Sequence, residues 1–128
     1  MPASRLDLLR PAARLGLAAV FVGAGVLHFV APGPFERIVP PLLPAALAVQ
    51  ASGVFEVLGG LGLLVPRTRR AAAWGLLALL VAVFPANVYA ALRPETMAFA
   101  PPWALWARLP VQPLLMAAVA WAGELRQR

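Results

Sequence analysis

The chain has no cysteine and a single histidine, and charged residues make up only 12% of its 128 residues. Without cysteine it can form no disulfide, thiol redox couple, iron–sulfur cluster or thiolate metal site. A single histidine excludes haem held by two histidines and any histidine-rich metal site within one chain. The sequence therefore predicts no metal site, and redox chemistry would have to be borrowed from a cofactor or a partner.

Hydrophobic residues make up 62% of the chain, far above the roughly half-apolar composition of soluble domains. This composition indicates a lipid bilayer as the natural solvent. The length allows one membrane domain, residues 1–128, in which four spans of about 20 residues nearly use up the chain. The net charge of +6 comes from arginines at the ends of apolar runs. Because they form no continuous basic face, they favour membrane topology over nucleic-acid binding.

We expect an all-α bundle of four transmembrane helices with both termini in the cytoplasm. Prolines punctuate the chain between the apolar runs, and Pro85 predicts a kink inside the third span. The fourth span starts at either Pro102 or Pro110. A signal peptide is the alternative for the first run, but that run is long for one and the rest of the chain is too apolar for water. The four spans cover approximately residues 13–31, 45–65, 71–92 and 104–123.

Five polar side chains break the apolar pattern of the spans, where an ionisable group costs about 2.5–3.5 kcal/mol. Counted from the outer end of each span, they lie about 6 to 18 Å deep, and the single acidic one, Glu56, is the deepest. Similar depths on four helices predict a shared pocket that opens to the outside, with Arg108 as a further candidate. The five are His28, Gln50, Glu56, Asn87 and Gln112.

The alternative interpretation is that these groups only hydrogen-bond one helix to another, which is common in membranes. For Gln50, Asn87 and Gln112 this is the simpler explanation, and a lone histidine such as His28 is more often a satisfied donor than a ligand. Glu56 differs because an acid near the bilayer midplane requires a partner or a function.

Small residues flank Glu56 at helical spacing and predict close packing of that face against another helix. On the first span, Gly16 and Gly23 are seven residues apart and are expected to receive it. The stripe beside Glu56 consists of Ser52, Gly53, Gly59 and Gly60.

Six short segments carry a family resemblance over residues 15 to 121. They are Gly25-Val26-Leu27-His28-Phe29 with Pro32 and Phe35, Ile38-Val39-Pro40-Pro41, Ser52-Gly53-Val54-Phe55-Glu56, Gly59-Gly60-Leu61-Gly62-Leu63-Leu64-Val65-Pro66, Phe84-Pro85-Ala86-Asn87 and Arg108-Leu109-Pro110-Val111-Gln112. Together they resemble the DoxX-like family of small four-helix bacterial membrane proteins. The resemblance implies a four-helix bundle in the bacterial inner (plasma) membrane. Some relatives are membrane subunits of quinone-linked sulfur-compound oxidoreductases, and others have been placed with redox-homeostasis complexes.

Three functions compete. The first is an accessory membrane subunit whose outward pocket takes a quinone or another apolar small molecule. The second is a non-catalytic anchor or assembly factor that binds another membrane protein, or a second copy, through its glycine and alanine faces. The third is a small proton or solute carrier with Glu56 as the relay. No enzymatic motif transfers from the family, so we expect no catalytic residue, and the absence of cysteine argues against thiol exchange.

The arginine distribution predicts orientation, because cytoplasmic loops are enriched in positive charge. The two tails and the turn at 66–70 hold eight of the eleven basic residues. A single cysteine introduced in that turn should therefore resist an impermeant thiol reagent in intact cells, whereas one at Glu36, Arg37, Glu95 or Trp103 should react. The opposite labelling pattern would invert the assignment.

Overall fold

The computed structural model describes residues 4–97 and 100–125, which fold entirely into helices and turns, with no strand among them. The predicted all-α class is confirmed. The elements are α1 (Arg5–Val30), α2 (Pro32–Arg37), α3 (Ala45–Leu64), α4 (Arg69–Leu92), the 3-10 helix η1 (Pro94–Met97) and α5 (Pro102–Ala122).

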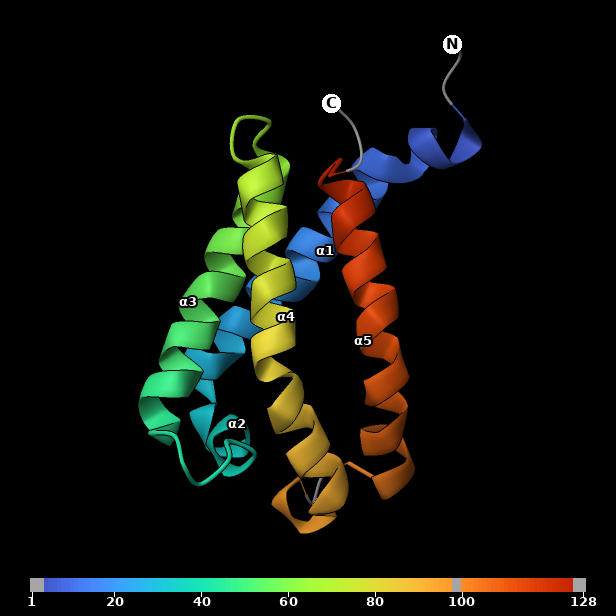
Figure 1. Cartoon of the computed structure of the whole chain (residues 1–128). Coiled ribbons are helices and arrows are strands. Elements are labelled where there is room, and N and C mark those ends of the chain that lie inside the picture. The colour runs from blue at the N-terminus through green and yellow to red at the C-terminus, as the bar shows by residue number, and fades with distance from the viewer. Residues whose placement is uncertain (1–3, 98–99, 126–128) are drawn as a thin grey trace.

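The four long helices run alternately in opposite directions (Figure 1). The α3–α4 turn and the two chain ends lie at one end of the molecule, and α2 and η1 lie at the other. In the packing order, α1 contacts α3, α3 contacts α4 and α4 contacts α5, while α1 and α5 touch over a smaller area. Helices adjacent in sequence along α3, α4 and α5 are thus also neighbours in space.

By length and composition, three helices are able to cross a membrane: α1, α3 and α4. They indicate a membrane protein. The fourth long helix, α5, is not among them, although it has 21 residues. Its three prolines, three tryptophans and Arg108 lower its hydropathy.

The first helix begins earlier than the sequence predicts, and the last helix has one of the two starts that the sequence left open. The first helix begins at Arg5 rather than near residue 13, because Ser4 and Asp7 form a capping box that satisfies backbone N–H groups. The last helix begins at Pro102, where proline suits the first turn of a helix, and continues through Pro110. The short helix α2 was expected to be loop.

Helices α3 and α1 pack closely, and glycine makes this contact possible. A Cβ atom added to Gly53 would lie 2.8 Å from Phe29 Cε2 and 2.9 Å from His28 Cβ. One added to Gly60 would lie 3.1 Å from the carbonyl oxygen of Ala18. The predicted close packing of the α3 stripe is therefore confirmed on this face.

Gly59 turns to the other neighbour of α3, where an added Cβ would collide with the side chain of Leu76 on α4. Glycines on two sides of α3 thus let both α1 and α4 approach closely.

The expected receiving stripe on α1 was wrong. Gly16 and Gly23 are exposed, and an added Cβ at either meets nothing within 4 Å. The buried face of α1 instead contains Gly25, where a Cβ would lie 2.6 Å from the Gly53 carbonyl oxygen. Gly23 precedes Gly25 by two residues, or about 200° of helix rotation, so it points almost the opposite way.

Three arginines converge on Glu124 where α5 ends. Its carboxylate lies 3.2 Å from Arg14, 3.6 Å from Arg10 and 3.8 Å from Arg69. The same arginines also cap helix ends, since Arg14 Nε donates to the Ala122 carbonyl at 2.8 Å and Arg69 Nε donates to a carbonyl at the end of α3 at 2.9 Å. This cluster joins α1, α3, α4 and α5 at the end of the bundle that holds the termini.

Replacing Gly60 by Leu should destabilise the protein by about 1–3 kcal/mol, because the larger side chain overpacks the α1–α3 contact. The matched control is Gly23→Leu, which adds the same side chain at an open position of α1. Melting temperatures in mild detergent measure both. Equal melting temperatures for the two variants would contradict this packing.

Glu124→Gln should lower stability by about 1 kcal/mol, because it leaves three converging arginines without their shared carboxylate. The loss should shrink in about 1 M salt, where charges are screened within about 3 Å. Glu95→Gln, at an exposed residue of the opposite end, serves as control. A melting temperature equal to that of the control at low salt would show that the cluster is energetically neutral.

Candidate functional site

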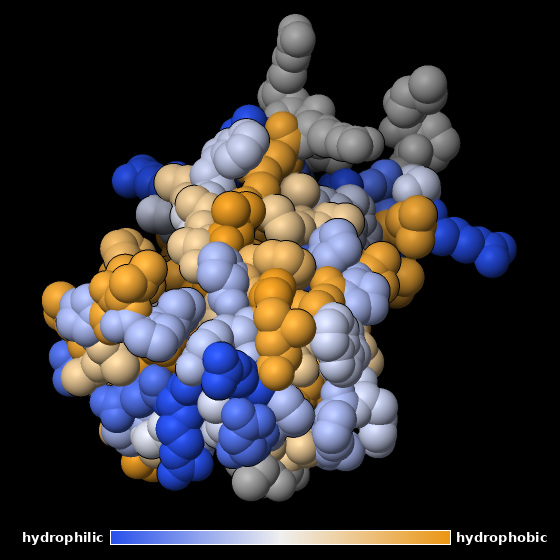
Figure 2. All heavy atoms as spheres, turned by 60° about the horizontal axis from the view of Figure 1, so that its bottom comes forward, coloured by the Kyte–Doolittle hydropathy of each residue, from blue (hydrophilic) through white to orange (hydrophobic). Residues whose placement is uncertain are grey.

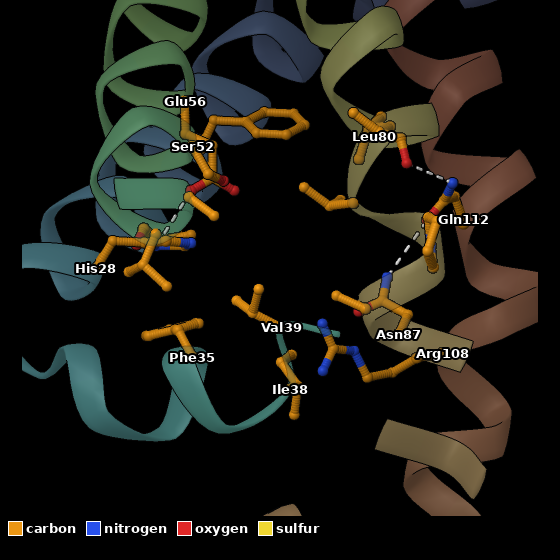
Figure 3. Close-up of a pocket in the computed structure, with 18 of the residues that line it drawn as sticks. His28, Phe35, Ile38, Val39, Ser52, Glu56, Leu80, Asn87, Arg108 and Gln112 are labelled. Atoms are coloured by element: carbon orange, nitrogen blue, oxygen red, sulfur yellow. Dashed lines mark hydrogen bonds and ion pairs between the residues drawn. The ribbon is translucent and has the colours of Figure 1, made fainter. Parts of the chain in front are cut away.

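A cavity of about 380 Å³ lies between the helices, and all five α-helices contribute to its lining (Figure 3). Most of the lining is aliphatic or aromatic, and the volume is within the range of small-molecule sites. Polar side chains stand on two facing walls. They are His28, Ser52, Glu56, Asn87, Arg108 and Gln112.

The first wall pairs His28 of α1 with Glu56 of α3. The Nδ1 atom of His28 lies 3.2 Å from Glu56 Oε2 and 2.6 Å from the Ala24 carbonyl oxygen. The ring is buried and stacks on Phe35 of α2, with centroids 4.1 Å apart and planes 17° apart. Three helices therefore fix the orientation of the imidazole.

His28 Nδ1 cannot donate equally to Glu56 Oε2 and to the Ala24 carbonyl oxygen, because a ring N–H has one hydrogen. When Nδ1 carries the proton, the shorter contact directs it to the Ala24 carbonyl. Glu56 Oε2 is buried and accepts no hydrogen bond within the described part of the chain. The carboxyl group is thus the less satisfied partner, and it lines the cavity.

The second wall is a hydrogen-bond chain between α4 and α5. Gln112 is buried, its Nε2 donates to the Leu80 carbonyl at 2.7 Å, and its Oε1 accepts from Asn87 Nδ2 at 3.3 Å. Pro85 has no N–H to donate to the Val81 carbonyl one turn back, and the Gln112 amide bonds the carbonyl of the preceding residue, Leu80. This is the helix-to-helix bonding that the simpler interpretation of the amides predicts, although both side chains also line the cavity.

Arg108 of α5 extends its guanidinium between the two walls, toward Val39 (Figure 3). Its Nη1 lies 3.9 Å from the sulfur of Met97, a weak acceptor. The structure thus brings five of the six predicted pocket residues to one cavity: His28, Glu56, Asn87, Arg108 and Gln112.

Gln50 is the exception. It is exposed on α3 and does not line the cavity, because its neighbour Val49 occupies the buried position and one residue turns the helix by about 100°. Its depth in the span suggested Gln50 as a cavity residue, but its direction around the helix axis excludes it from the lining.

Sequence reasoning missed Ser52 and Phe35 as cavity residues. Ser52 precedes Glu56 by one turn on the same face, a spacing that could have indicated it. The stacking role of Phe35 depends on α2 folding back against α1, which no local pattern marks. Within the ranges 4–97 and 100–125, no three His, Cys, Asp or Glu side chains gather where they could hold a metal ion.

Comparison with curated proteins found no match, and comparison with solved structures found none. One family model, described as a domain of unknown function (DUF8561), matches residues 17–126. That match contains every residue that lines the cavity. The chain therefore belongs to the DUF8561 family.

Proposed function

We propose that the chain crosses the bilayer four times, with α5 as the fourth span and both termini in the cytoplasm. Two features support this. A helix of 21 residues is about 30 Å long, enough for the hydrocarbon core. The alternating direction of the helices brings the termini and the arginine-rich turn at 66–70 to one end. In this orientation the part of the cavity lined by the α2 segment and Arg108 faces the outer side of a bacterial plasma membrane.

The proposed function is that of an accessory membrane subunit that binds a quinone or another apolar small molecule with a polar group. The observation that carries it is the cavity itself, which combines an apolar lining with polar side chains on two facing walls. Sites for small molecules share this composition, since apolar walls supply affinity and few polar groups set orientation.

The chemistry of the two walls suits a quinone. Its ring carbonyls need hydrogen-bond donors, which the amide of Asn87 and the guanidinium of Arg108 can supply. The carboxyl group of Glu56 can accept from the hydroxyl of the reduced form. Electron transfer would take place with a partner, in line with the DoxX-like resemblance.

The second candidate, a membrane anchor or assembly factor, is favoured by an exposed face of α1. Small residues at helical spacing are exposed there and would let another helix approach closely. They are Ala12, Gly16, Ala19 and Gly23.

A hydrophobic quinone such as decylubiquinone should raise the melting temperature of the protein in mild detergent. At about 100 times its Kd, a ligand stabilises the folded state by about 2.7 kcal/mol. Ala48→Phe fills the cavity and should abolish the shift, while Ala51→Phe, an exposed position on the same helix, should retain it.

Two other variants test the polar wall. Glu56→Gln should keep much of the fold, because the amide retains hydrogen bonding. Glu56→Leu loses this hydrogen bonding and should in addition weaken binding of the quinone. Absence of a shift in the wild type, or equal shifts for the two Ala→Phe variants, would refute binding in this cavity. A stoichiometric protein partner without bound quinone, seen by native mass spectrometry, would favour the anchor function.

A further inference from the structure

Arg108 is a cation on the cavity wall that forms no ion pair with an acidic side chain in the part of the chain that the structure describes. Among residues 4–97 and 100–125, the ion pairs involve other basic groups, and no carboxylate lies within 4.0 Å of its guanidinium. Its one side-chain hydrogen bond in this range is the long contact to Met97 Sδ. Most of its five N–H donors are therefore available to a ligand.

Three arginines at the other end of the bundle form ion pairs, in contrast to Arg108. Arg10 and Arg14 lie within 4.0 Å of carboxylates, as does Arg69. Arg108 is itself exposed at the edge of the cavity, where its planar guanidinium can form two parallel hydrogen bonds with a carboxylate or phosphate.

Arg108 lies toward the α2 and η1 end of the cavity, while Glu56 is a polar group deeper in the bundle. Arg108 follows the start of α5 by six residues, about 9 Å along the helix, and Asn87 lies about 8 Å from the end of α4 that faces the same side. Deeper along the helices, the lining contains Phe21, Leu80 and Leu115. A ligand can thus place a charged head beside Arg108 and an apolar chain along these side chains toward the middle of the bundle.

We propose that Arg108 binds the oxyanion head group, a carboxylate or phosphate, of an amphiphile whose apolar chain occupies the rest of the cavity. This inference rests on the proposed binding function and names the chemical class of its ligand. The volume of about 380 Å³ lies near the lower limit of small-molecule sites, which suits one chain. The head group can belong to a free acid or to an anionic lipid of the bilayer.

The test compares decanoate with decanol, which share a chain and differ in the charge of the head, at about pH 8, where the acid is ionised. Apparent Kd values come from melting-temperature titrations in a neutral detergent. In Arg108→Gln, the Kd of decanoate divided by the Kd of decanol should rise about tenfold or more relative to the wild type. Partition into micelles is the same for each variant and cancels in this comparison.

Arg93→Gln is the matched control, because Arg93 is exposed, lies at the same end of the bundle and does not line the cavity. Its Kd ratio should equal that of the wild type. If Arg108→Gln has the same Kd ratio as the wild type, the inference is overturned. If that variant does not fold, the wild type decides the question, because equal stabilisation by decanoate and by decyltrimethylammonium would also overturn it.

A second arm identifies the source of the head group. Native mass spectrometry of protein equilibrated with phosphatidylglycerol and phosphatidylcholine should show retention of the anionic lipid that depends on Arg108 if a bilayer lipid is the ligand. Decanoate binding without such retention would indicate a free acid. If decylubiquinone, decanol and decanoate all fail to bind, the proposed function fails as well. If the neutral probes bind in an Arg108-independent way and decanoate shows no preference, only this inference fails.

Discussion

The close approach of α1 and α3 is the contact on which the rest of the structure depends. Gly25 and Gly53 face each other so closely that neither position has room for a methyl group. In a bilayer, where apolar side chains gain nothing by leaving lipid, such close packing is a main source of helix association. The same contact carries His28 to the carboxyl group of Glu56, so packing and the first polar wall share one cause.

The other wall is built on different physics. There the helices are joined by hydrogen bonds from Gln112 to the backbone of α4 and to Asn87, at the turn that Pro85 alters. Glycines let α1, α3 and α4 pack closely, while α5 packs on α4 through Val119 and Gly123 and is also joined to it by these hydrogen bonds and by the arginine cluster around Glu124. The cavity lies between these two assemblies, and its polar side chains are therefore at once structural and available to a ligand.

The end of the molecule that holds α2 and η1 differs in character from the helical body. Hydrophilic side chains gather where the α2 and η1 end comes forward, beside apolar ones (Figure 2). The segment that contains α2 returns over the cavity and supplies Phe35, Ile38 and Val39 to its lining. Because this short helix is held mainly by packing against α1, α3 and η1, it is the part of the cavity wall with the least secondary structure of its own.

Composition and the spacing of apolar runs determined the helical class and the membrane character, because a chain so poor in charge has few other stable solutions. The cost of polar groups in lipid identified four of the cavity residues, His28, Glu56, Asn87 and Gln112, without any coordinates. Composition and the cost of polar groups did not determine which side of each helix faces the interior. Gly16, Gly23 and Gln50 have suitable residue types and depths, yet about 100° to 200° of rotation turns them to the outside. Only the tertiary contact between Gly25 and Gly53 fixes that rotation, since periodicity alone leaves more than one small-residue face on α1.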